Sequence, residues 1–172
     1  GDTAQEITVT ALLARLYQRR GDVQAMVRHY RQVIRVARRS GNRYELARAC
    51  SNLGYYYIER GHLWRAEVLS LTALAIFDEL ASDHGRAHTH NHLGILFTRQ
   101  YDWMKAKEHL IAACTIWQAS QDQYGLMLAG ALLSIVLNPF MFRLNPLLEK
   151  WLKKVPGLWQ RLEHGGPTPN TA

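Results

Sequence analysis

Residues 53–62 read LGYYYIERGH, and the same pattern recurs on both sides at an offset of 40 residues. The matching stretches are LARLYQRRGD at 13–22, LGILFTRQYD at 93–102 and LSIVLNPFMF at 133–142. Each begins with Leu and a small residue, and a large residue follows three positions after the small one. The first three end in dipeptides that mark a tight turn. The pattern therefore predicts a helix that ends at a fixed point in every copy.

Beyond each of these turns, apolar residues return at helical spacing. They are Met26, Tyr30, Val33 and Ala37, then Ala66, Leu69, Ala73 and Phe77, then Ala106, Leu110, Ala113 and Trp117. This spacing predicts a second helix with one buried stripe, and further turns are expected at 40–42, 82–85 and 120–122. Short side chains allow two helices to approach closely. Each unit is therefore predicted to be a helical hairpin.

This combination resembles the tetratricopeptide repeat over residues 5–137. The period of 40 exceeds the usual period of about 34 and is similar to longer repeats in bacterial signal-transduction ATPase regulators, quorum-sensing peptide receptors and kinesin light chain. The resemblance implies an all-α, right-handed superhelical stack of antiparallel helix hairpins. We expect repeats over about 5–42, 43–82, 83–122 and, in part, 123–140, within a single domain over 1–164.

The fourth copy departs from the pattern. Its first helix, about 123–137, meets Asn138-Pro139, where we expect it to stop. A capping helix is expected over about 144–164 and a disordered tail over 165–172; a dimer interface or a partner-docking helix is the alternative role of the cap. Residues 124–142 carry no formal charge, but the repeat register favours burial between helices over insertion into a membrane.

Composition narrows the function classes. The chain has 172 residues, 48% of them hydrophobic, and a formal charge of +7, which is a globular composition attracted to acidic surfaces. Cys50 and Cys114 form no CxxC motif, so we expect free thiols in a reducing cytoplasm. No phosphate-binding loop, GxSxG or HExxH motif is present. The sequence therefore predicts a protein that is not an enzyme and needs no cofactor.

The resemblance implies that the first helices of successive hairpins line a concave groove. Its partner-binding residues would be Arg15, Arg48, Asn52, Tyr55, His88, Asn91, His92 and Arg99. Asn52 and His92 share one repeat position, where an Asn in longer-repeat relatives resembles the residue that binds the backbone of an extended peptide. Arg48 and Arg99 would pair with acidic side chains or a terminal carboxylate. A solvated helix face is the alternative for each of these residues.

Two further groups of residues carry charge or could carry it. His84, His88 and His92 follow an i, i+4, i+8 spacing, but no carboxylate or Cys completes a ligand set and His84 is expected before the helix. We therefore predict no metal site and favour a polar groove, one that could respond to pH. Arg28, Arg31, Arg35 and Arg38 form a basic stripe at 3-4-3 spacing, either a phosphate-binding surface or a solvated convex face.

The leading prediction is a module that binds a protein or a peptide, with an extended or acidic segment held in its concave groove. Residues 40–67 and 121–136 resemble the C-terminal repeat regions of bacterial signal-transduction ATPases and transcriptional activators, which implies the sensor or assembly part of a larger regulatory protein. The alternatives are an accessory binder of nucleic acid or of an anionic surface through the basic stripe, and an enzyme subunit whose catalytic domain lies elsewhere.

Overall fold

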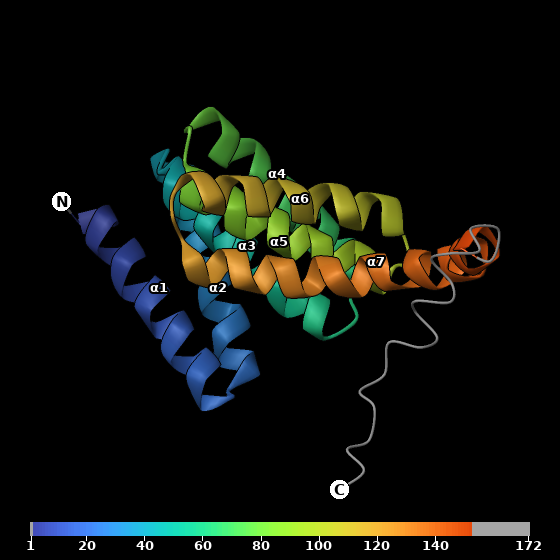
Figure 1. Cartoon of the computed structure of the whole chain (residues 1–172). Helices are drawn as coiled ribbons and strands as arrows, with labels where there is room; N and C mark the ends of the chain where they lie inside the picture. Colours follow the sequence, from blue (N-terminus) through green and yellow to red (C-terminus); the bar gives the residue numbers. More distant parts are fainter. Residues whose placement is uncertain (1, 153–172) are drawn as a thin grey trace, which may run out of the picture. The chain divides into compact units, whose positions relative to one another are not determined.

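In the computed structural model, the backbone is described for residues 2–152 and the side chains for residues 3–138. The described residues form seven helices and no strand (Figure 1). They are α1 (Asp2–Arg20), α2 (Val23–Ser40), α3 (Arg43–Glu59), α4 (Leu63–Glu79), α5 (Asp83–Arg99), α6 (Trp103–Ala119) and α7 (Gln123–Leu152). The predicted all-α stack of helix hairpins is confirmed.

The helices from α2 onward begin at exact intervals of 20 residues, at 23, 43, 63, 83, 103 and 123. At five of these six starts, the preceding residue is an N-cap whose side-chain oxygen accepts from the backbone N–H three residues later, as Asp22 does from Ala25 at 3.0 Å. Asn42, Ser82, Asp102 and Asp122 make the same bond. His62 alone among these caps makes none. Half of the 40-residue repeat is therefore itself a structural unit.

Each turn contains one residue in the left-handed region, again at intervals of 20. These residues are Gly21, Gly41 and Gly61 at φ 73–76°, and Ala81, Tyr101 and Gln121 at φ 50–61°. The next residue donates its N–H to the carbonyl five residues earlier, as Asp22 does to Tyr17 at 3.0 Å. This bond is the mark of a Schellman cap, which ends a helix and lets the next one start at once.

Within residues 2–136, successive helices pack as antiparallel hairpins: α1 with α2, α3 with α4, and α5 with α6. The hairpins stack because α2 packs on α3, α4 packs on α5, and the first helices α3 and α5 lie side by side (Figure 1). Small residues permit the close approach inside a hairpin. A Cβ atom added at Gly54 would lie 2.8 Å from the Ser70 hydroxyl, and one at Gly94 would lie 2.6 Å from the Leu110 side chain.

Two predicted boundaries are corrected. The turn expected over 82–85 lies instead at residues 80–82, because α4 ends at Glu79, Ser82 caps the N–H of Gly85 and α5 already begins at Asp83. The break expected at Asn138-Pro139 is wrong, since α7 continues to Leu152. A proline removes one backbone hydrogen bond and crowds one carbonyl, which bends a helix without requiring it to end.

Contacts divide the chain into two units, Gly1–Val136 and Leu137–Ala172, where a single domain over 1–164 was expected. The boundary falls inside α7, two residues before Asn138. No separate helix begins near residue 144, because α7 spans that position; the rest of the expected cap and the tail lie outside the described residues. None of the described helices is long and apolar enough to cross a membrane.

Candidate functional site

A pocket of about 360 Å³ lies on the side of the stack formed by the first helices, and we call it the α1–α3–α5 pocket. Five of the eight predicted partner-binding residues line it: Arg15, Arg48, Asn52, His88 and His92. The rest of the wall is Tyr44, Ser51, Phe77, His84 and Gly85. All three hairpins contribute, so the pocket exists only when the hairpins are stacked.

The positive charge of the pocket comes from two arginines with different surroundings. Arg48 is half-buried and its Nη2 lies 2.7 Å from the carboxylate of Glu45, so this charge is balanced within α3. Arg15 is exposed on α1 and makes no ion pair with any described residue. Arg15 is therefore the cation that remains available to an acidic ligand.

A chain of hydrogen bonds forms one wall between α3 and α5. The Ser51 hydroxyl lies 3.2 Å from the Thr89 hydroxyl and 3.2 Å from His92 Nδ1. Ser51 and Thr89 are 5% and 0% exposed. This buried contact fixes the ring of His92 beside Asn52, which is half-buried and directly lines the pocket.

The histidine row follows α5 along the pocket, and His84 lies in the first turn of that helix, not before it as expected. The His84 and His88 rings lie 4.5 Å apart, and His88 meets Trp117 edge-on at 5.3 Å. Burial lowers the pKa of His92 to about 4 and, with the nearby His84, lowers the pKa of His88. Both rings are therefore neutral near pH 7, when each can donate one hydrogen bond and accept another.

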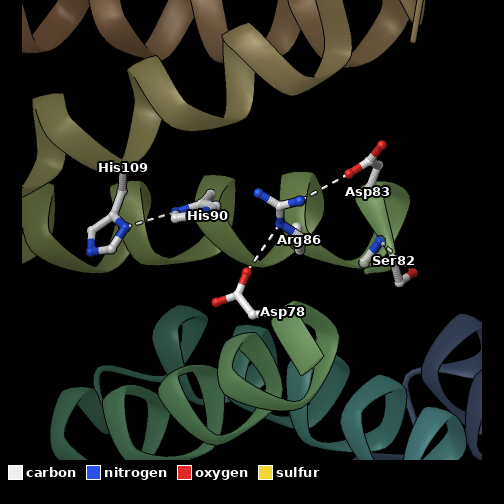
Figure 2. A network of polar contacts seen from close by, with 7 residues as sticks. Asp78, Ser82, Asp83, Arg86, His90 and His109 are labelled. Carbon is white, nitrogen blue, oxygen red and sulfur yellow. Dashed lines mark hydrogen bonds and ion pairs between the residues drawn. The ribbon is translucent and has the colours of Figure 1, made fainter. Parts of the chain in front are cut away.

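Metal ligands do not gather on this row. Within residues 3–138, no three His, Cys, Asp or Glu side chains lie close enough together to hold a metal ion. The fourth histidine of this helix, His90, points instead toward α6, where its Nδ1 lies 2.9 Å from Nδ1 of His109 (Figure 2).

The remaining three predicted partner-binding residues lie outside the pocket. Tyr55 does not line the pocket but contacts a residue that does, because its ring packs on His92 at a centroid distance of 4.7 Å. Asn91 was expected in the groove, and this prediction is wrong because the residue is only 3% exposed. Asn91 is one position before His92 on α5, so its side chain points in a different direction, into the stack. Arg99 reaches back to the preceding hairpin, where its Nη1 donates to the Ile58 carbonyl at 2.8 Å.

Sequence reasoning missed the aromatic part of the wall. Tyr44 and Phe77 come from α3 and α4 and meet edge-on at 5.9 Å. Gly85 leaves room for Phe77, because a Cβ there would collide with the Phe77 ring. Phe77 was assigned only to the buried stripe, and Tyr44 lies before the aligned stretch, which begins at Leu53. The period-40 alignment contained no signal that would have joined them.

A polar network holds the second and third hairpins together next to this wall (Figure 2). Arg86 of α5 bridges two carboxylates, with Nε 3.0 Å from Asp78 of α4 and Nη1 3.0 Å from Asp83. Figure 2 also shows Ser82 capping the same helix start. The ion pair with Asp78 therefore ties the start of α5 to α4.

The basic stripe lies on α2, away from the wall of the pocket. Its four arginines are exposed, and Arg28, Arg31 and Arg35 line an open groove together with Val23 and Val27. Arg31 donates to the Tyr57 hydroxyl at 3.1 Å. No described residue forms an ion pair with any of the four, and α2 contains no acidic residue.

Comparison with known proteins agrees with the helical-repeat fold. Residues 6–79 match the family model of the tetratricopeptide repeat. The crystal structure of BtubC (BKLC) from P. vanneervenii superposes with a TM-score of 0.75 at 20% identity, over 100% of this chain and 70% of that one. The apo form of RapI gives a TM-score of 0.75 at 19% identity, over 90% of this chain and 42% of that one.

The chain thus spans less than half the length of RapI, and no curated protein matches it. At these identities, the two solved structures establish the fold alone. The first two hairpins match the tetratricopeptide repeat family, and the third continues the same stack.

Proposed function

We propose that this chain is a protein-interaction module that binds an extended, acidic segment of a partner across the α1–α3–α5 pocket. The observation that carries the proposal is that three hairpins place Arg15, Arg48, Asn52, His88 and His92 around one cavity. The module contributes binding and no catalytic step.

Each side chain has a defined part in the proposed complex. Asn52 both donates and accepts, which suits the alternating N–H and C=O groups of an extended peptide backbone. Arg15 provides the unbalanced positive charge for a carboxylate of the ligand. Tyr44 and Phe77 offer apolar surface beside it, and the neutral His88 adds directional hydrogen bonds. The ligand class is therefore a peptide with one acidic and at least one apolar side chain.

The wider role that we propose is the sensor or assembly part of a larger bacterial regulatory protein in the cytoplasm. The supporting observations are the tetratricopeptide match and the 40-residue period, together with the two free thiols, which suit a reducing compartment. Whatever the surrounding protein, the pocket is the part that would distinguish one partner from another.

The test is selection from a displayed library of acidic dodecapeptides, followed by fluorescence anisotropy with the best peptide. Arg15→Ala and Asn52→Ala should each weaken binding by about tenfold, since each removes a charge-assisted or paired hydrogen bond. Arg28→Ala is the matched control, because it removes an exposed arginine outside the pocket. A loss in Arg28→Ala as large as that in Arg15→Ala would show nonspecific charge attraction and would contradict the assignment of the site.

A second candidate function is the binding of a polyanion along the basic stripe of α2. It is supported by the four exposed arginines, which form no ion pair with a described residue. Binding there would be independent of base sequence and strongly dependent on salt. The measurement is the salt dependence of affinity for a single-stranded oligonucleotide. Replacing Arg28, Arg35 and Arg38 by Gln should make the slope of log K against log salt shallower by about two, because each phosphate contact on a single strand contributes about 0.7. An unchanged slope excludes the stripe.

A further inference from the structure

The outward face of α1 carries an apolar strip that no described residue covers. Val9, Leu12 and Leu16 are 55%, 51% and 45% exposed. Together with Leu13, Arg15 and Arg19 they line a shallow groove of about 460 Å³. Three adjacent large apolar side chains on one helix face are unusual for a surface that meets only water.

The repeat register shows what this face is built to meet. One and two repeats later, the position of Val9 is held by Ala49 and Thr89, which are 3% and 0% exposed. In those hairpins the preceding second helix packs on the first helix: α2 packs on α3, and α4 packs on α5. At the position of Val9, the inner repeats therefore bury the first helix against the preceding hairpin, where Thr89 contacts Ser51 of α3. The position of Leu12 is held instead by Asn52 and His92, which line the pocket. The part of α1 around Val9 is thus a face that meets another helix in the inner repeats.

The strip also has the spacing of a helix-pair seam. Val9, Leu12 and Leu16 follow a 3-4 interval, which keeps a side chain facing a partner helix at every turn. Charges at the two ends of α1 differ in sign: Glu6 lies near its start, and Arg19 and Arg20 form its last turn. Two such helices side by side would repel if parallel and attract if antiparallel.

We propose that a second copy of this chain covers the strip, with α1 of one copy packed antiparallel on α1 of the other across a two-fold axis. The seam is then self-complementary, since the apolar centre of each helix meets that of its partner and each Glu6 faces the partner's Arg19-Arg20 end. A single helix pair buries less than the roughly 800 Å² per partner of a standard interface. The dimer is therefore a weak one that forms as concentration rises.

Sedimentation equilibrium over a wide range of concentrations tests the proposal on the full chain. The wild type should show a monomer–dimer equilibrium, and Leu12→Glu should weaken it by at least about tenfold, because a charge is then buried in the seam. Leu71→Glu is the matched control: Leu71 is 43% exposed on α4, outside the strip. A wild type that stays monomeric, or a dimer that Leu12→Glu leaves unchanged, overturns the proposal.

A charge reversal tests the antiparallel orientation separately. Glu6→Arg should weaken the dimer, and adding Arg20→Glu in the same chain should restore it, since the opposite charges then meet again in reversed places. Failure of the double variant to recover would contradict an antiparallel pair. Arg15 lines both this groove and the α1–α3–α5 pocket, so it is left unchanged throughout. Neither outcome depends on the peptide-binding proposal.

Discussion

The Nδ1 atoms of His90 and His109 lie 2.9 Å apart, and this hydrogen bond joins α5 to α6 inside the third hairpin. One ring must donate and the other accept, so the bond requires at least one neutral histidine. The other face of His109 stacks on Phe97 at 5.3 Å. Burial, followed by the nearby His109, lowers the pKa of His90 to about 4. Burial also lowers the pKa of His109, which Glu108 opposes.

This pair should make the fold sensitive to acid. Between pH 6.5 and 4 the unfolded His90 binds a proton that the folded one excludes, so the free energy of unfolding falls as pH falls through this range. Allowing for partial exposure, His90 should contribute about 1 kcal/mol of the difference between pH 7 and pH 5. Urea titrations of His90→Gln should show that much less pH dependence. His62→Gln, a substitution at an exposed histidine in a turn, is the matched control variant.

Substitutions at two equivalent left-handed turn residues should change the free energy of unfolding in opposite directions. Ala81 has φ 50° where three other turns carry glycine, and this conformation costs a residue with a side chain about 1 kcal/mol. Ala81→Gly should therefore raise the free energy of unfolding by about 0.5–1 kcal/mol, and Gly61→Ala should lower it by a similar amount. Thermal unfolding measures both. A loss of stability in Ala81→Gly would contradict the assigned turn.

The effect of replacing a helical glycine by alanine should depend on how closely other atoms surround it. Gly94→Ala should destabilise by about 1–3 kcal/mol, because the new Cβ would lie 2.6 Å from Leu110. Gly130 of α7 has no described atom within 4 Å of an added Cβ. Gly130→Ala should therefore stabilise by up to about 1 kcal/mol through helix propensity alone. If Gly94→Ala also raised stability, the close approach of α5 and α6 would be wrong.

The missing cap at His62 should be repairable. The side chain of His62 makes no cap hydrogen bond at the start of α4, whereas Asp22 and Asp122 do so at equivalent positions. His62→Asp should supply the bond and a favourable charge at the helix start, raising stability by about 0.5–1 kcal/mol. Asp22→Ala should lose about the same amount. The melting temperatures of the two variants are compared with that of the wild type.

The two thiols should differ in reactivity. Burial raises the pKa of Cys50 to about 11, and the side chain is 1% exposed. Burial also raises the pKa of Cys114, which is only half-buried. With Ellman's reagent at pH 8, we expect one slow reaction at Cys114 and none at Cys50 until the chain unfolds. Rapid labelling of Cys50, read by mass spectrometry after digestion, would show that α3 opens in the native state.

The repeats made the hairpins predictable because one alignment repeated Leu, a small residue, a large residue and a turn. That alignment placed Arg15, Arg48, Asn52, His88 and His92 correctly on first helices, and the structure brings all five to one pocket. The alignment failed where the packing of neighbouring helices determines whether a side chain is buried. Asn91 is adjacent to His92, yet a single step along a helix turns it about 100° into the stack. Whether α7 continues through Pro139 depends on two free energies: the cost of one lost backbone hydrogen bond and the gain from continuing the helix. The residues next to Pro139 do not determine which of the two is larger.

The exact 20-residue interval between helix starts restricts which insertions and deletions the fold can accept. Adding or removing one residue inside a helix would turn every later residue of that helix by about 100°, taking its buried stripe and its turn residue out of place together. A gain or loss of 40 residues would leave every cap, turn and stripe in register. We therefore expect natural variation in length to arrive as entire hairpins, so that such a change would move the site by a whole hairpin without distorting the hairpins that remain.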